Sequence, residues 1–90
     1  MNQTRTQPSL KVLYTDTVKS IRSRGKTKNG GYFFEVYFTD CNTDDDEIIR
    51  WGLYFNRNNT IPYKIGDLAT YQILEYGLNY IIKFHNLNLK

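Results

Sequence analysis

Cysteine and histidine are nearly absent from this chain, which has one of each, Cys41 and His85. A single cysteine cannot form an internal disulfide, so the composition fits a reducing compartment. Zinc sites built from cysteine and histidine need about four ligands, more than these two residues supply. His85 also has no nucleophile or metal ligand at a recognised spacing. We therefore expect a protein that is not an enzyme and that needs no metal or cofactor.

Long hydrophobic runs are missing as well. No stretch approaches the ~18 apolar residues that a membrane span requires, and the polar residues up to Pro8 form no signal segment. We therefore expect no membrane partner and a cytoplasmic location, in a bacterium or in an infected host cell. The abundance of Asn, Ile, Lys and Tyr suggests an AT-rich genome, such as a phage genome or a small bacterial genome. The 90 residues predict one folded domain over residues 10–90, preceded by a disordered arm of residues 1–9.

The net charge of +3 hides a polarised pattern. Residues 1–31 carry a net charge of +6, residues 32–49 carry −6, and residues 50–90 carry +3. Such a separation creates an electric field with a direction, which favours partners of one charge over the other.

Short runs of β-branched and aromatic residues predict strands throughout the chain. No segment of ten or more residues shows the 3.6-residue period of a helix, and a single turn around residues 58–63 is the one place where we expect helical structure. The predicted strands are residues 10–22, 32–39, 47–55, 68–76 and 80–89.

The first predicted strand does not keep one alternation. Val12, Tyr14 and Val18 share a face, whereas Ile21 falls on the opposite face. A bulge or strong bend between Val18 and Ile21 would bring all four to the same side. The segment that follows, residues 23–31, is basic and contains Asn-Gly, a pair that accepts the positive φ of tight hairpin turns.

Five strands with a long, bent first strand predict an all-β fold, a small barrel. The chain resembles the OB-fold family, the oligonucleotide-binding barrels, in three features. These are the long first strand with its basic loop, Lys64-Ile65-Gly66-Asp67 leading into the fourth strand, and the final hairpin of residues 68–89. The helix that this family has between strands three and four is at best vestigial here, so an SH3-like barrel is the alternative.

Alternation divides each of the two central strands into two faces. We assign the more apolar set of each strand to the core, although a slip of one residue would expose Trp51 and bury Tyr54. The expected core sets are Phe34, Val36 and Phe38 on one strand, and Ile49, Trp51, Leu53 and Phe55 on the other.

The remaining surface of these strands is expected to combine aromatic rings with cations. OB-fold proteins bind strands of nucleic acid across this face, and the resemblance implies a non-catalytic protein that binds single-stranded DNA, or less favourably RNA, with little sequence preference. Such proteins protect exposed strands during DNA replication, recombination or repair. The expected base-stacking residues are Phe33, Tyr37 and Tyr54, and the expected phosphate contacts are Lys19, Arg22, Arg24, Lys26, Lys28, Arg50 and Lys83.

Other interpretations stay open at this point. The aromatic face equally suits a homo-oligomer or a protein partner, as in a structural barrel or a viral accessory protein that also uses Leu87 and Leu89. The acidic segment after residue 39 has Asp45 and Trp51 where a calcium loop needs Gly and Glu, which excludes an EF-hand. The basic segment lacks the residue order of a phosphate-binding loop.

Overall fold

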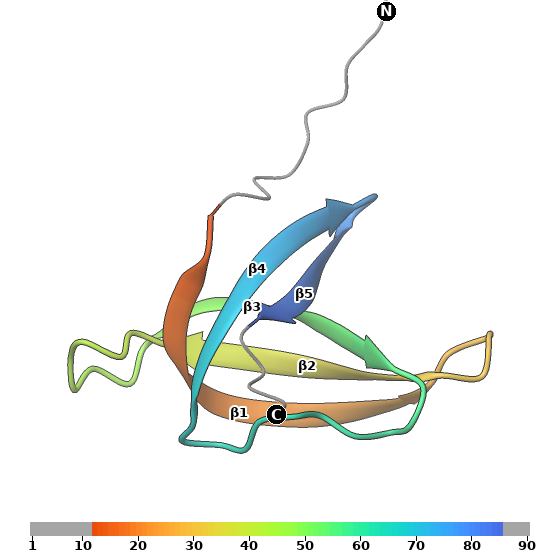
Figure 1. Cartoon of the computed structure of the whole chain (residues 1–90), viewed down its shortest axis with the longest axis horizontal. Coiled ribbons are helices and arrows are strands. Elements are labelled where there is room, and N and C mark those ends of the chain that lie inside the picture. Colours follow the sequence, from red (N-terminus) through yellow and green to blue (C-terminus); the bar gives the residue numbers. More distant parts are fainter. Residues whose placement is uncertain (1–11, 86–90) are drawn as a thin grey trace, which may run out of the picture.

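The computed structural model describes residues 12–85, so the predicted arm and the C-terminal leucines lie outside the described residues. The described residues form five strands and no helix. The strands close into a barrel in the order β1-β2-β3-β5-β4 (Figure 1). Their bounds are Tyr14–Lys26 for β1, Tyr32–Thr39 for β2, Ile48–Asn56 for β3, Leu68–Tyr76 for β4 and Asn79–His85 for β5.

The predicted fold class, a small five-stranded all-β barrel, is therefore confirmed, and both an OB-like and an SH3-like description fit it. Neighbouring strands are antiparallel except β3 and β5, which run parallel. These two are paired only at Leu53 and Ile81, and this short seam closes the barrel.

The bulge predicted in the first strand is present. The register of β1 against β2 shifts between Val18 and Ser20, so that Ser20 lies opposite Tyr37 and Ile21 lies opposite Val36. The extra residue turns Ile21 to the same side as Val18, where it packs against the core. β1 also continues beyond its predicted end at residue 22, because the basic residues up to Lys26 still pair with β2.

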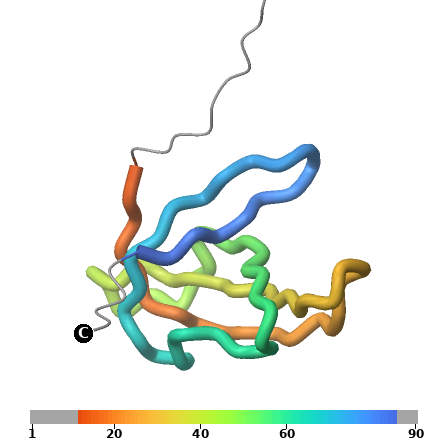
Figure 2. The backbone as a smooth tube through the Cα atoms, turned by 45° about the vertical axis from the view of Figure 1, so that its right-hand side comes forward, coloured from red at the N-terminus to blue at the C-terminus, as the bar shows by residue number. Residues whose placement is uncertain are grey.

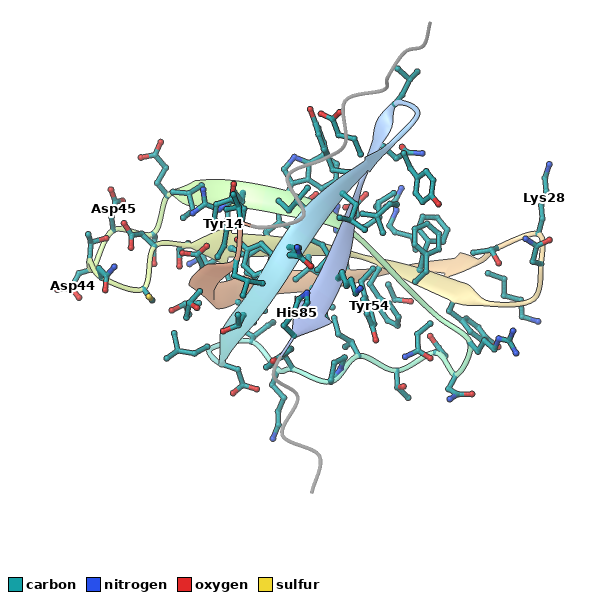
Figure 3. The ribbon with its side chains drawn as sticks, turned by 45° about the horizontal axis from the view of Figure 1, so that its top comes forward. Tyr14, Lys28, Asp44, Asp45, Tyr54 and His85 are labelled. Carbon is teal, nitrogen blue, oxygen red and sulfur yellow. The ribbon has the colours of Figure 1, made fainter. Side chains whose placement is uncertain are left out.

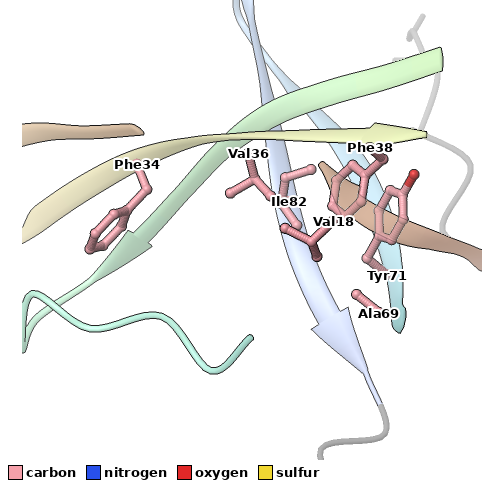
Figure 4. Close-up of a cluster of buried hydrophobic side chains, with 7 residues drawn as sticks. All are labelled: Val18, Phe34, Val36, Phe38, Ala69, Tyr71 and Ile82. Carbon is pink, nitrogen blue, oxygen red and sulfur yellow. The ribbon is translucent and has the colours of Figure 1, made fainter. Parts of the chain in front are cut away.

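The core is a single cluster of buried side chains that runs along the barrel interior (Figure 4). At one end the rings of Phe38 and Tyr71 lie stacked, with centroids 3.9 Å apart. Burial of each large apolar side chain contributes about 1.5–3 kcal/mol to folding. The core residues are Val18, Phe34, Val36, Phe38, Ala69, Tyr71 and Ile82, which include the whole set expected from β2.

The connector between β3 and β4 takes the place of a helix. Gly66 and Asp67 form backbone hydrogen bonds with Val18 at the β1 bulge, 2.8 and 2.9 Å long, and the positive φ of Gly66 (98°) makes the turn possible. Tyr63 packs on Phe84, with ring centroids 4.8 Å apart. The connector thus contributes apolar side chains to the core without the helical turn that we expected at residues 58–63.

Two connections frame one face of the barrel. The loop between β1 and β2 and the tip of the β4–β5 hairpin project on the same side, with the end of β3 between them (Figure 2). The hairpin turns at Gly77 and Leu78, and Gly77 has the positive φ (61°) that such tight turns need.

Candidate nucleic-acid interface

Two pairs of aromatic rings lie on the outer face of β2 and β3. Phe33 is paired with Phe55 in the antiparallel register, and Tyr37 is paired with Trp51. The ring centroids are 5.6 Å apart in the first pair and 5.4 Å in the second, and the planes are within 16° of parallel. We call these four residues the aromatic strip.

The strip is more exposed on its β3 side than the sequence predicted. Trp51 is 45 % exposed and Phe55 is 44 % exposed. Assigning Trp51, Phe55 and also Ile49 (40 % exposed) to the core was therefore wrong, and Leu53 of the same set is only partly buried. Phe33 and Tyr37 do lie on the outer face as expected. The sequence did not indicate Trp51 and Phe55 as candidate site residues, because the more apolar face of β3 was expected to be the inner one.

Gly52 accounts for the orientation of β3, in which Trp51 and Phe55 face outward instead of inward. β3 crosses close over β5 at this residue, and a Cβ placed on Gly52 would lie 2.8 Å from Ile82 Cδ1 and 3.1 Å from the Tyr80 carbonyl oxygen. A side chain at this position would therefore require the Ile82 side chain to shift. Because side chains alternate along a strand, an inward Gly52 also turns Arg50 and Tyr54 inward.

Arg50 therefore lies on the inner side of β3 with one-third of its side chain exposed, and Asp16 and Tyr71 engage the guanidinium that we expected to contact phosphate. Its Nη2 lies 3.3 Å from Asp16 Oδ2, its Nε donates to the Tyr71 hydroxyl (3.2 Å), and its guanidinium lies 3.9 Å from the centre of the Tyr14 ring. Asp16 is only 4 % exposed, so its charge needs this partner. The sequence did contain a signal, since Asp16 lies between Tyr14 and Val18 on the inner face of β1.

The same group of side chains includes the hydroxyl of Tyr71, which donates to Asp16 Oδ2 over 2.7 Å. Burial, reinforced by this hydrogen bond, raises the pKa of Tyr71 far above its ordinary value. Oδ2 of Asp16 thus has two side-chain partners, Arg50 and Tyr71. A carboxylate oxygen of Asp16 also lies within 4.8 Å of possible ligand atoms of Asp40 and Cys41, but the positive charge of Arg50 beside this carboxylate disfavours a cation here.

Tyr54, the expected stacking residue on β3, lies on the inner side of this strand, with its ring against the core. It is partly buried and packs between Phe34 and Phe84, with ring centroids 6.3 and 4.9 Å away. Its hydroxyl accepts a hydrogen bond from the Asn56 side chain over 3.1 Å. Tyr54 therefore belongs to the core of the barrel.

A carboxylate lies in the middle of the strip. Glu35 is on the outer face of β2, between Phe33 and Tyr37, and it pairs across the strands with Leu53. The Tyr37 hydroxyl donates to Glu35 Oε1 over 2.8 Å, and Arg24 Nε lies 3.4 Å from Glu35 Oε2. The hydrogen bond to Glu35 raises the pKa of Tyr37, with a smaller contribution from burial. Glu35 therefore holds the Tyr37 ring in place and takes up one of the expected phosphate-binding cations.

The other expected phosphate-binding cations differ in whether another side chain already engages them. Lys19 lies 3.4 Å from Asp46, and Lys26 lies 5.9 Å from the centre of the Tyr32 ring. Arg22 is exposed on the outer face of β1, opposite Glu35. Lys28 is exposed in the β1–β2 loop, and Lys83 is exposed on β5.

A shallow hollow lies at each end of the aromatic strip. One hollow, of about 450 Å³, is bordered by Lys19, Arg22 and Tyr37. The other, of about 220 Å³, is bordered by Phe55 and Arg57. Arg57 is a further residue that sequence analysis did not single out, although it directly follows the third predicted strand. Each aromatic pair thus has a concave surface and a cation beside it.

The charged loops lie at opposite ends of the molecule. Lys28 marks one end of the long strands, and Asp44 and Asp45 mark the other (Figure 3). The charge separation seen along the sequence is therefore also a separation in space. A negatively charged ligand on the strip is attracted toward the β1–β2 loop and repelled from the β2–β3 loop.

His85 lies away from the strip and is hydrogen-bonded through Nε2 to Oε1 of the buried Gln72. Its backbone carbonyl accepts from the Tyr63 hydroxyl over 3.3 Å. These contacts tie the end of β5 to β4 and to the connector, which is a structural role.

Residues 12–85 contain no helix that is long and apolar enough to cross a membrane. No protein-family model, curated protein or solved structure matches this chain.

Proposed function

We propose that this protein binds single-stranded nucleic acid on the aromatic strip, without catalysis and with little sequence preference. The observation that carries the proposal is the two stacked ring pairs on one barrel face, each with one exposed ring, Trp51 or Phe55, and a cation-bordered hollow at each end. Every base has a π-face, so ring stacking is worth about 1–3 kcal/mol per base whatever the sequence.

Cations near the strip supply the second requirement. Arg22 and Arg57 are exposed beside the two hollows, and Lys28 extends the positive charge into the β1–β2 loop. Each cation that contacts a phosphate releases counterions from the strand and adds affinity at low salt. Double-stranded nucleic acid hides its base faces within the stack, so stacking rings select single strands.

The path of the ligand follows from the OB-like arrangement. In OB-folds the strand lies over strands two and three, between the β1–β2 and β4–β5 loops. These two loops project on the same side of this barrel (Figure 2). The proposed path lies between them and over the strip. A role in protecting exposed single strands is part of the proposal.

Fluorescence anisotropy with labelled oligothymidine at two salt concentrations tests the proposal. We expect that the protein binds the oligonucleotide and that its affinity falls steeply as the salt concentration rises. The double variant Trp51→Ala with Phe55→Ala should bind at least tenfold more weakly than the wild type. Ile65→Ala is the matched control, because Ile65 is exposed and apolar but belongs to the connector. No binding at low salt, or equal binding by the strip variant and the control, would refute the proposal.

A contact between copies of this chain is the second candidate function. Ile48 and Ile49 are exposed beside Trp51 on β3 and extend the apolar surface without adding charge. Sedimentation of the free protein decides between the candidates. Two results together would favour a contact between copies of this chain. The protein would form a concentration-dependent dimer that Trp51→Ala dissociates, and it would not bind the oligonucleotide.

A further inference from the structure

The aromatic strip is divided into two platforms. Tyr37 follows Phe33 by four positions on β2, and at about 3.3 Å per residue the two ring pairs lie about 13 Å apart along the strand. Glu35 and Leu53 occupy the position between them. A ligand therefore contacts two separate stacking surfaces, and the carboxylate of Glu35 lies between them.

Each platform has the parts that one nucleotide needs. The Tyr37–Trp51 pair lies beside the hollow that Lys19 and Arg22 border. The Phe33–Phe55 pair has Phe55 itself in the wall of the second hollow, together with Arg57. A base can stack on the rings while its sugar and phosphate occupy the hollow near a cation.

The carboxylate between the platforms keeps some accepting capacity. Glu35 Oε1 accepts from Tyr37, Oε2 lies near Arg24, and the side chain is 18 % exposed. A carboxylate offers about four lone-pair sites, so each oxygen can accept one more hydrogen bond. Its charge repels phosphate, which directs the backbone of the ligand toward the cations of β1 and places bases, not phosphates, over Glu35.

Building on the proposed function, we propose that the strip holds three consecutive nucleotides of a single strand. The two outer bases stack on the two platforms, and the middle base lies over Glu35. Two steps across about 13 Å correspond to about 6.5 Å per step, about twice the 3.4 Å rise of stacked bases. The strand is therefore stretched, and its bases stack on the protein instead of on one another.

Glu35 also makes the middle position selective. A carboxylate accepts hydrogen bonds from the exocyclic amino groups of cytosine, adenine and guanine. Thymine and uracil offer a carboxylate only their ring N3–H, and the carbonyl oxygens on both sides of it repel the carboxylate. The middle nucleotide is thus one with an amino-bearing base, while the outer positions accept any base.

Trp51 is the single tryptophan of the chain, so its fluorescence reports directly on one platform. We would titrate the full chain at low salt with d(TTT), with d(TCT), and with d(TTT) lacking the base at the first, middle or last position. Loss of an outer base is expected to weaken binding about tenfold, and loss of the middle thymine less than twofold. The cytosine trinucleotide is expected to bind about threefold to tenfold more tightly than d(TTT).

Glu35→Gln tests the selectivity separately from the fold. Glutamine keeps an acceptor for the Tyr37 hydroxyl, but its amide can also donate to thymine, so the ratio of the d(TCT) and d(TTT) affinities is expected to fall to about one. Equal losses at all three abasic positions, or a cytosine preference that survives in Glu35→Gln, would overturn the inference. So would an absence of trinucleotide binding beside tight binding of a twelve-nucleotide oligothymidine. If the long oligothymidine also fails to bind, the proposed function itself is wrong.

Discussion

Arg50 Nη2 lies 3.3 Å from Asp16 Oδ2, and this contact ties β3 to β1 across the barrel interior. The carboxylate is almost fully buried, while the side chain of Arg50 keeps 33 % of its surface exposed. Removing one member of a buried ion pair leaves the other charge without compensation. The contact therefore stabilises the orientation of β3 in which Arg50 faces the barrel interior and Trp51 faces solvent.

Substituting Arg50→Gln should destabilise the fold. A fully buried pair loses about 3–5 kcal/mol when one member is removed; the partial exposure of Arg50 lowers our expected loss in the free energy of unfolding to about 2–3 kcal/mol. Urea denaturation measures it. The double variant Asp16→Asn with Arg50→Gln should lose less than the sum of the two single changes, because no buried charge is left alone. Additive losses would show that the two residues do not interact.

Gly52→Ala should destabilise the barrel by about 1–3 kcal/mol, the usual cost of overpacking. The added methyl group would meet Ile82 Cδ1 at 2.8 Å. Thermal unfolding followed by circular dichroism measures the loss. Ile82→Val removes the Cδ1 atom, so combining it with Gly52→Ala should recover part of the loss. A harmless Gly52→Ala would mean that β3 and β5 are farther apart than the structure has them.

Trp51→Ala and Tyr54→Ala should have opposite effects. Trp51 lies on the outer face, so its loss should weaken oligonucleotide binding by about 1–3 kcal/mol and change stability little. Tyr54 packs between Phe34 and Phe84, so its loss should lower the free energy of unfolding by about 2–4 kcal/mol. Urea denaturation and anisotropy on the same two variants separate these effects. The reverse result would place the indole in the core.

Stability should fall in alkaline solution because of Tyr71. Its pKa is raised in the folded state by burial and by the hydrogen bond to Asp16. A raised pKa contributes stability that is complete below the unfolded value of about 10 and is lost as the pH rises from there toward the folded value. The free energy of unfolding, measured by urea denaturation between pH 9 and about pH 11, should therefore decline with pH.

Tyr71→Phe should make that decline smaller, because phenylalanine has no proton to lose. The variant should be less stable than the wild type at neutral pH by about 1–3 kcal/mol, since Asp16 loses a donor. Tyr14→Phe is a suitable control, because Tyr14 lies beside Tyr71 without a hydrogen bond to Asp16. An unchanged alkaline slope in Tyr71→Phe would assign the titration to other residues.

Salt dependence should identify the cations that contact phosphate. On a single strand, each lost phosphate contact lowers the slope of log K against log salt by about 0.7. Arg22→Gln and Arg57→Gln should each show this decrease. Arg50→Gln should not, because Arg50 is engaged with Asp16. Lys64→Gln on the connector is a second control, since Lys64 borders neither hollow.

Local patterns were enough to locate most of the strands. The bounds of β2 and β4 are those expected, because turn residues flank each of these runs of strand-forming residues. The bulge in β1 was also predictable, since Val18 and Ile21 are both apolar and cannot otherwise face the same side. β1 extends farther than expected because pairing with β2 overrides the loop character of residues 23–26.

The orientation of β3 was decided by contacts that no local pattern contains. Its more apolar face, with Trp51 and Phe55, points outward because Gly52 is needed where β3 crosses β5 and because Asp16 requires Arg50 inside. Ile82 is distant in sequence from Gly52, and Asp16 is distant in sequence from Arg50. The sequence by itself thus determined a small β-barrel with aromatic residues on both faces of its central strands and charge separated along the chain. Only the closed tertiary structure decided which rings meet solvent, because closure sets how near two strands approach and which buried charge must be neutralised.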